Sequence, residues 1–303
     1  MRVLLAAPSS PARLRNLVPL AWALRTAGHD VKIAGRPSFV EEILRTATVA
    51  VDLESGDEAT LAESAALAEF AKLWRPGVVV SDGQAPAGTA AARAVDAVAV
   101  RLLGALDEPD ASDADTTFDT VPASLRAGGG AVHPVRHVPY FGPVEVPTWL
   151  RRKARRARVL LSLSDAALFG TVFDAVAGTD LEVVCAADTA NLPAGTTVPA
   201  NVRLVDSAPP AALLPTCAAV IHDGDPELAL AAAAHGLPQH SLTGSVLARR
   251  VETAGAGLVD EAPSTGLIRQ LVAGETLRAG ASALRDEITA LPAPREIAAQ
   301  LTR

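Results

Sequence analysis

The feature that most constrains the fold is a repeated alternation of short apolar runs with segments of helical periodicity. The clearest run is Gly77–Ser81, which is β-branched at its centre and is followed by a helical pattern over Ala87–Val95. Earlier in the chain, the apolar run Arg2–Ala7 precedes residues that are apolar at helical spacing from Asn16 to Ala27. Apolar strands that alternate with helices are typical of a parallel sheet covered on both faces. The sequence therefore predicts an α/β fold.

This alternation stops after residue 103 and starts again at residue 158. An acidic stretch over residues 107–130 and a Pro-rich segment over residues 132–147 lie between the two blocks. The chain has 303 residues, which is long enough for two domains of roughly 150 residues each. We therefore expect two doubly wound domains, over residues 1–144 and 145–303. Ligands of such sheets bind at the carboxyl ends of the strands, so we expect a site in a cleft between the domains.

Composition and charge exclude several classes of function. The net charge of −7 disfavours nucleic acid as a partner. No apolar run approaches the length of a membrane span, and the apolar N-terminus is too short for a signal peptide, so we expect a cytoplasmic protein. Cys185 and Cys217 lie in apolar stretches without metal-binding spacing and are expected to be reduced thiols. We predict no metal site.

Two charged stretches are explained by exposure to solvent, without a ligand. The acidic stretch contains Asp107, Asp110, Asp113, Asp115 and Asp119, but it lacks the central Gly and terminal Glu of a calcium-binding loop. We interpret it as a solvated, mobile loop. The basic run over residues 151–158 can hold an anion, but we favour its interpretation as a solvated start of the second domain.

The segment over residues 220–239 combines a shape that suits anions with a sequence that repels them. An apolar strand leads through Asp223-Gly224 into a helix that Asp225 can cap and that Gly236 and Pro238 terminate. Such a helix N-terminus attracts phosphate through its free N–H groups and its dipole. Here, however, the first turn already carries acidic residues, including Glu227.

Several short segments recur together in one order along the chain. They are NLVPLAWALRTAGHDV (residues 16–31), VPYFGP (residues 138–143), and NVRLVD, LLPTCAAV, ARRV and GAGL of the second half. In this order they resemble the GT-B, family 1 glycosyltransferases of actinobacterial antibiotic pathways, in which the first segment corresponds to the first helix and the second to the interdomain linker. The resemblance implies two Rossmann-like domains that face a central cleft. The first would be a shortened acceptor-side domain and the second the donor-side domain.

On the acceptor side, the resemblance implies that the catalytic base has been replaced. In this family a His before the first helix deprotonates the acceptor hydroxyl, and an Asp orients that His. Arg13 stands at or beside the position of the His, and Asp82 matches the Asp. A guanidinium stays protonated at neutral pH and cannot serve as a base. We therefore expect an ion pair between Arg13 and Asp82.

On the donor side, the resemblance implies that the diphosphate site has been altered. The family motif is His-His-Gly-Gly-x-Gly-Thr, and this chain has His222-Asp-Gly-Asp-Pro-Glu-Leu228 in its place. Glycine allows the backbone to approach a phosphate, whereas carboxylates repel it. The segment that begins with Gln239 and His240 is shorter than in the family and lacks the acidic–Gln pair that holds the donor sugar. We therefore expect no cofactor, and a nucleotide sugar is disfavoured.

The candidate site residues follow from these comparisons. The candidate catalytic residues are Asp82, His222, Asp223, Asp225 and Glu227, because clustered buried carboxylates have raised pKa values and can act as acids. The candidate binding residues are Ser9, Arg13, His137, Tyr140, Gln239 and His240. A structural role is the alternative for two of the histidines: His222 can bond to backbone, and His240 can bond carbonyls at a helix end.

Three hypotheses about function remain open at this point. In the first, which the cluster of acids beside His222 favours, the chain has lost nucleotide-sugar transfer and is a repurposed enzyme that acts on a small polyketide-like intermediate in the interdomain cleft by acid–base or cyclisation chemistry. In the second, it is a non-catalytic auxiliary subunit of a biosynthetic enzyme, as a hetero-complex or a homodimer. In the third, it is an active glycosyltransferase with an atypical site. The resemblance thus implies a role in natural-product biosynthesis but leaves open whether the chain is an enzyme.

Overall fold

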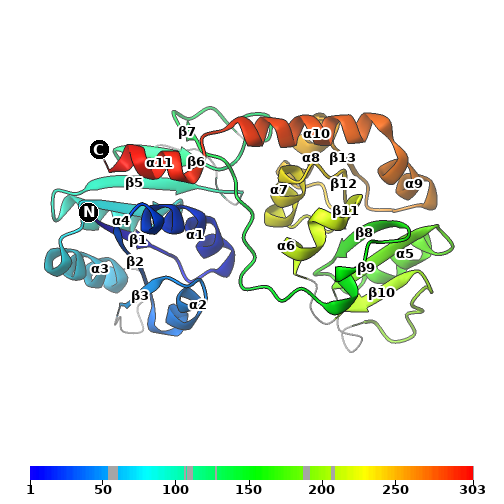
Figure 1. Cartoon of the computed structure of the whole chain (residues 1–303), viewed down its shortest axis with the longest axis horizontal. Helices are drawn as coiled ribbons and strands as arrows, with labels where there is room; N and C mark the ends of the chain where they lie inside the picture. The colour runs from blue at the N-terminus through cyan, green and yellow to red at the C-terminus, as the bar shows by residue number, and fades with distance from the viewer. Residues whose placement is uncertain are drawn as a thin grey trace. The chain divides into compact units, whose positions relative to one another are not determined.

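The computed structural model describes residues 1–53, 61–105, 107, 112–126, 128–186, 192–205 and 209–302. The chain forms two compact units (Figure 1). The first comprises Met1–Ala123, Ala127–Pro143 and Ala290–Arg303, and the second comprises Ser124–Arg126 and Val144–Thr289. The C-terminal residues therefore belong to the first unit, whereas the sequence prediction placed all of 145–303 in the second.

The described residues of the first unit form a parallel sheet of seven strands in the order β3-β2-β1-β4-β5-β6-β7. Its strands are β1 (Arg2–Ala6), β2 (Asp30–Gly35), β3 (Val49–Asp52), β4 (Val78–Asp82), β5 (Val98–Leu103), β6 (Thr116–Asp119) and β7 (His133–Pro134). Its helices are α1 (Pro11–Thr26), η1 (Pro37–Phe39), α2 (Val40–Leu44), α3 (Leu61–Trp74), α4 (Pro86–Arg93) and α11 (Pro294–Leu301). The predicted α/β fold of this half is confirmed.

The return of the chain to the first unit has a simple physical cause. The apolar side chains of α11, Ile297 and Ala298, are buried in the same core cluster as Leu17 and Leu24 of α1. The preceding backbone is held as well, since the N–H of Arg136 donates to Pro292 O at 2.8 Å. Burial of this apolar face stabilises α11 on the first unit.

The second unit also contains a parallel sheet, of six strands among its described residues, in the order β10-β9-β8-β11-β12-β13. Its strands are β8 (Ala157–Ser162), β9 (Leu181–Ala186), β10 (Val202–Val205), β11 (Ala219–His222), β12 (Gln239–Ser241) and β13 (Gly257–Val259). Its helices are η2 (Thr148–Arg151), α5 (Leu168–Val176), α6 (Pro210–Leu213), η4 (Leu214–Thr216), α7 (Pro226–Ala234), α8 (Val246–Thr253), α9 (Thr265–Ala273) and α10 (Glu275–Ala290).

The acidic stretch that follows β5 is more ordered than predicted. Asp119 is 2% exposed at the end of β6 and accepts a hydrogen bond from the Val121 N–H at 2.8 Å. Asp115 pairs with Arg93 at 2.8 Å and also accepts from the Ala99 N–H. The interpretation as a mobile loop is therefore wrong for these residues, and Asp110 lies outside the described residues.

The two cysteines are unpaired, as the sequence predicts. Cys185 is buried in β9 and Cys217 is partly buried, both are free thiols, and burial raises the pKa of each to about 12. Such thiols are protonated and unreactive at neutral pH.

Within the part of the chain that the structure describes, no helix combines the length and the hydropathy needed to cross a membrane.

Candidate functional site

The N-terminus of α7 is capped by the protein's own carboxylate. Asp225 precedes the helix, and its side chain accepts hydrogen bonds from the N–H groups of Glu227 at 2.9 Å and Leu228 at 3.1 Å. Pro226 occupies the first helical position, as the sequence indicates. Glu227 is half-buried in the same turn. The N–H groups that would otherwise attract a phosphate are therefore already bonded to an anion.

The turn before α7 is constrained by close packing. Gly224 has a φ of +99°, a conformation that favours glycine. A Cβ at this position would collide with the Thr243 hydroxyl, which itself donates to Asp223 O at 3.0 Å. The predicted tight turn at Asp223-Gly224 is thus present, and Thr243 occupies the space beside it.

Asp223 is a structural carboxylate. It accepts hydrogen bonds from the Ser164 N–H and hydroxyl, both at 2.6 Å, and from the Asp165 N–H at 2.9 Å. Burial alone would raise the pKa of Asp223, but these hydrogen bonds prevail and lower it below its usual value. The expectation of a raised pKa is therefore wrong for Asp223, which is poorly suited to donate a proton.

His222 is locked by hydrogen bonds on both sides of its ring. The side chain is 1% exposed, and its Nδ1 accepts from the Gly224 N–H at 3.1 Å. A backbone N–H can only donate, so the ring proton sits on Nε2, 3.3 Å from Gln239 Oε1. Burial lowers the pKa of His222, which keeps the ring neutral. Both ring nitrogens are engaged, so the structural interpretation of His222 holds.

Gln239 and His240 form part of the sheet rather than a ligand-binding loop. Gln239 is 2% exposed, and its amide nitrogen donates to Ala229 O at 2.9 Å, which ties β12 to α7. His240 is fully buried, with Nε2 at 3.0 Å from Asp260 O. We predicted both as binding residues, but their side chains are buried in the protein and are not exposed to a ligand. The residues of β12 are polar, so in the sequence they resemble a surface loop rather than a buried strand.

Arg13 forms the predicted ion pair. It lies in the first turn of α1 and is 8% exposed, and its Nη1 is 2.7 Å from Asp82 Oδ1 at the end of β4. The same Nη1 is 2.8 Å from Asp107 Oδ1. Asp107 also accepts from the Gly104 N–H at 2.9 Å, which fixes it beside the end of β5. Asp107 was missed as a site residue because its neighbours in sequence suggested a solvated loop.

The environment of Asp82 gives it a different protonation behaviour from Asp223. Burial raises the pKa of Asp82, and the charge of Asp107 adds to this effect, against hydrogen bonds from Gln84 and Arg13. Asp82 borders a cavity of about 640 Å³ within the first unit, which Ser81 and Arg101 also line. The Ser81 hydroxyl is buried, and it has no hydrogen-bond partner among the described residues.

The remaining binding candidates are dispersed within the first unit. Ser9 is exposed in the loop between β1 and α1. Tyr140 packs edge-on against Trp22, with ring centroids 5.0 Å apart, and burial raises the pKa of its hydroxyl. His137 lines a small cavity beside Asn16 and α11. These contacts give Tyr140 a packing role and do not group it with Ser9.

Comparison with known proteins places this geometry in a family. Residues 170–303 match the model of the erythromycin biosynthesis protein CIII-like C-terminal domain. The L-demethylnoviosyl transferase of Streptomyces niveus is 30% identical over 367 residues, which cover 98% of this chain and 97% of that protein. The chain belongs to the family of antibiotic-biosynthesis glycosyltransferases.

Solved structures of this glycosyltransferase family show the same GT-B fold. The glycosyltransferase SnogD from Streptomyces nogalater matches with a TM-score of 0.89 and 27% identity, over 99% of this chain and 98% of its own. The glycosyltransferase VinC, solved in complex with DTDP, has a TM-score of 0.89 and 28% identity, over 100% of this chain and 99% of its own. The predicted GT-B-like fold is confirmed.

The chain is nevertheless short for its family. The aclacinomycin-T 2-deoxy-L-fucose transferase of Streptomyces galilaeus is 28% identical over 416 positions, which cover 98% of this chain and 94% of that protein. Because this chain has 303 residues, at least 113 of those positions lie opposite gaps in it. The prediction of a shortened family member agrees with this difference in length.

Proposed function

We propose that this member of the glycosyltransferase family has lost the transfer of nucleotide-activated sugars and serves natural-product biosynthesis as a non-catalytic auxiliary protein. The observation that carries the proposal is the cap of α7. Asp225 occupies the N–H groups of Glu227 and Leu228 at 2.9 and 3.1 Å. A bound diphosphate would have to displace this carboxylate and would be repelled by it.

The acceptor side supports the same proposal. Arg13 stands where the resemblance places the catalytic base, and it is held by two carboxylates at 2.7 and 2.8 Å. Arginine cannot accept a proton at neutral pH. His222, the candidate catalytic histidine of the donor side, has both ring nitrogens engaged. Arg13 and His222 thus help to hold the fold together, which favours an auxiliary role over an enzymatic one.

The decisive experiment is a calorimetric titration with TDP and UDP. We expect no saturable binding at the α7 N-terminus of the wild-type protein. The variant Asp225→Gly with Glu227→Gly removes both carboxylates and should create measurable affinity for TDP if the carboxylates are what excludes it. Micromolar binding of TDP to the wild type that is lost when α7 is altered would favour a sugar-transfer function instead.

A second candidate function is retained because one observation favours it. The cavity of about 640 Å³ beside Asp82 has the size of a small-molecule site, and the pKa of Asp82 is raised by burial. A repurposed enzyme that protonates or cyclises a natural-product intermediate would use such a carboxyl as its acid. Thermal-shift titration with a panel of polyketide aglycones tests this candidate. Stabilisation of the wild type that Asp82→Asn abolishes would favour it over the auxiliary role.

A further inference from the structure

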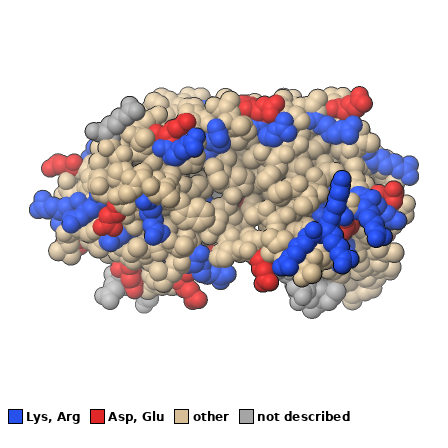
Figure 2. Space-filling view, viewed as in Figure 1, with Lys and Arg blue, Asp and Glu red and all other residues tan. Residues whose placement is uncertain are grey.

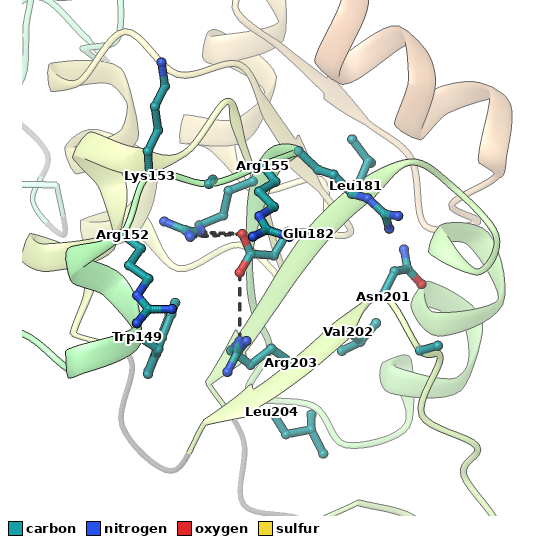
Figure 3. A pocket seen from close by; sticks show the side chains of 14 residues that line it. Trp149, Arg152, Lys153, Arg155, Leu181, Glu182, Asn201, Val202, Arg203 and Leu204 are labelled. Atoms are coloured by element: carbon teal, nitrogen blue, oxygen red, sulfur yellow. Dashed lines mark hydrogen bonds and ion pairs between the residues drawn. The ribbon is translucent and has the colours of Figure 1, made fainter.

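The second unit contains a cationic pocket that the functions above do not use. It has a volume of about 610 Å³ and lies where β8, β9 and β10 begin (Figure 3). Six cationic side chains and one carboxylate line it, namely Arg152, Lys153, Arg155, Arg156, Arg158, Arg203 and Glu182. The strands are parallel, so this pocket is at the sheet edge opposite to the carboxyl end of β11, where α7 begins.

The concentration of positive charge is unusual for this chain. Five of the six cations come from residues 152–158, and no acidic residue occurs between Glu145 and Asp165. The chain as a whole carries a net charge of −7. Figure 2 shows Lys and Arg side chains gathered over this part of the second unit. An acidic protein that keeps a local excess of positive charge in a concave site attracts anions to that site.

Part of the pocket is organised in advance of any ligand. Arg158 is 3% exposed and donates to Glu182 Oε2 at 2.9 Å and to the Thr216 hydroxyl at 2.7 Å. Arg203 lies 3.8 Å from the other oxygen of Glu182 (Figure 3). Both guanidinium groups lie over the ring of Trp149, at 5.5 and 5.0 Å from its centroid. One carboxylate therefore lies beside two guanidinium groups, of which that of Arg158 is buried and held by hydrogen bonds.

The other cations add charge that the fold does not neutralise. Arg156 pairs with Asp180 at 2.9 Å, but Arg152, Lys153 and Arg155 make no hydrogen bond or ion pair with the described residues. In Figure 3, Lys153 extends away from the cavity, whereas Arg152 and Arg155 are directed toward it. These two arginines are thus available to an incoming anion.

We propose that this pocket binds a small organic anion that carries a diphosphate group. Guanidinium groups match phosphate oxygens with paired hydrogen bonds, and the diphosphate would be held by Arg152, Arg155 and Arg203. The apolar side chains of Leu181, Val202 and Leu204 line the same cavity and would contact the organic part. A volume of about 610 Å³ fits a small molecule, whereas an acidic face of a protein requires no such hollow. The site is independent of the proposed loss of sugar transfer.

The test is calorimetric titration of the full chain with inorganic pyrophosphate. We expect saturable one-to-one binding to the wild type at low ionic strength, and a weakening of about tenfold or more in Arg152→Ala with Arg155→Ala. The matched control is Arg249→Ala with Arg278→Ala, which removes the same charge from exposed positions elsewhere in the second unit. The control should stay within about twofold of the wild type, because charges outside the pocket make no direct hydrogen bonds with the bound anion.

Several outcomes would overturn the proposal. These are an absence of binding, equal weakening in both double variants, or binding of a polyglutamate peptide without binding of pyrophosphate. The last result would identify the pocket as a protein-docking surface instead. A titration with TDP in the same variants separates this site from α7, since binding here is lost in Arg152→Ala with Arg155→Ala and binding at α7 is not. Circular dichroism establishes that both double variants are folded.

Discussion

Two groups of charged residues in this molecule differ in what their charges do. At the sites where the family resemblance places sugar transfer, each charge is bonded internally: Arg13 to Asp82 and Asp107, and Asp225 to backbone N–H groups. In the cationic pocket, Arg152 and Arg155 have no partner among the described residues. The first group holds the fold together, and the second is free to bind a ligand.

Under the proposed loss of sugar transfer, the difference illustrates how the protein's own charged side chains can take the place of a bound substrate. A helix N-terminus favours an anionic partner, and a buried carboxylate favours a cationic one. In this chain, Asp225 and Arg13 supply those partners permanently. The comparison predicts that removing a charge from the first group destabilises the protein, whereas removing one from the second does not.

The largest expected effect comes from Arg13→Ala. This substitution leaves the buried Asp82 and Asp107 without their cation, and the loss of a buried partner costs about 3 kcal/mol of unfolding free energy. Urea denaturation measures it when Trp149 is replaced by Phe, so that Trp22 and Trp74 report on the first unit alone. Arg13→Ala with Asp82→Asn should recover part of the loss, because it also removes one unpaired charge. Equal stability of Arg13→Ala and of Arg13→Ala with Asp82→Asn would show that an unpaired charge on Asp82 is not the cause of the loss.

A smaller effect is expected for Asp225→Ala. It removes the acceptor of the N–H groups of Glu227 and Leu228, and the loss of such a cap costs about 1 kcal/mol. Urea denaturation followed by the fluorescence of Trp149, with Trp22 and Trp74 replaced by Phe, reports on the second unit. Asp225→Ser retains a cap and should lie close to the wild type. If Asp225→Ala were neutral, the carboxylate would not be holding the helix in solution.

The features that sequence could predict are those with local signals. The alternation of apolar runs and helical patterns predicted both parallel sheets, and Asp-Pro-Glu predicted the cap of α7. The pair of Arg13 and Asp82, 69 positions apart, came only from the resemblance to a family. Asp107 and β12 were missed because buried polar residues look like loops when their partners are distant in sequence. The cationic pocket depends on Glu182 and Arg203, which no local pattern connects to residues 152–158.

The protonation of Asp223 predicts how the stability of the second unit depends on pH. The folded-state pKa of Asp223 is lowered by hydrogen bonds from Ser164 and Asp165, against the opposite effect of burial. Its contribution to stability is therefore present above the usual aspartate pKa of about 3.9 and is lost as pH falls below that value toward the lowered one. Between pH 6 and pH 3 the wild type should lose more unfolding free energy than Asp223→Asn. We expect this extra loss to be smaller than the loss of unfolding free energy caused by Asp225→Ala. Identical losses of unfolding free energy in the wild type and in Asp223→Asn would show that the charge of Asp223 does not stabilise the fold.

The smallest effect on stability is expected where the effect on binding is largest. Arg152→Ala with Arg155→Ala removes two exposed charges without partners, and such substitutions change stability little. The melting temperature should stay within about 1 °C of the wild type without ligand, and any shift should be upward because repulsion with Arg158 and Arg203 is relieved. With pyrophosphate present, the wild type should gain melting temperature and the variant should not. A large loss of stability without ligand would mean that these arginines hold the fold, and the distinction between the two groups of charges would fail.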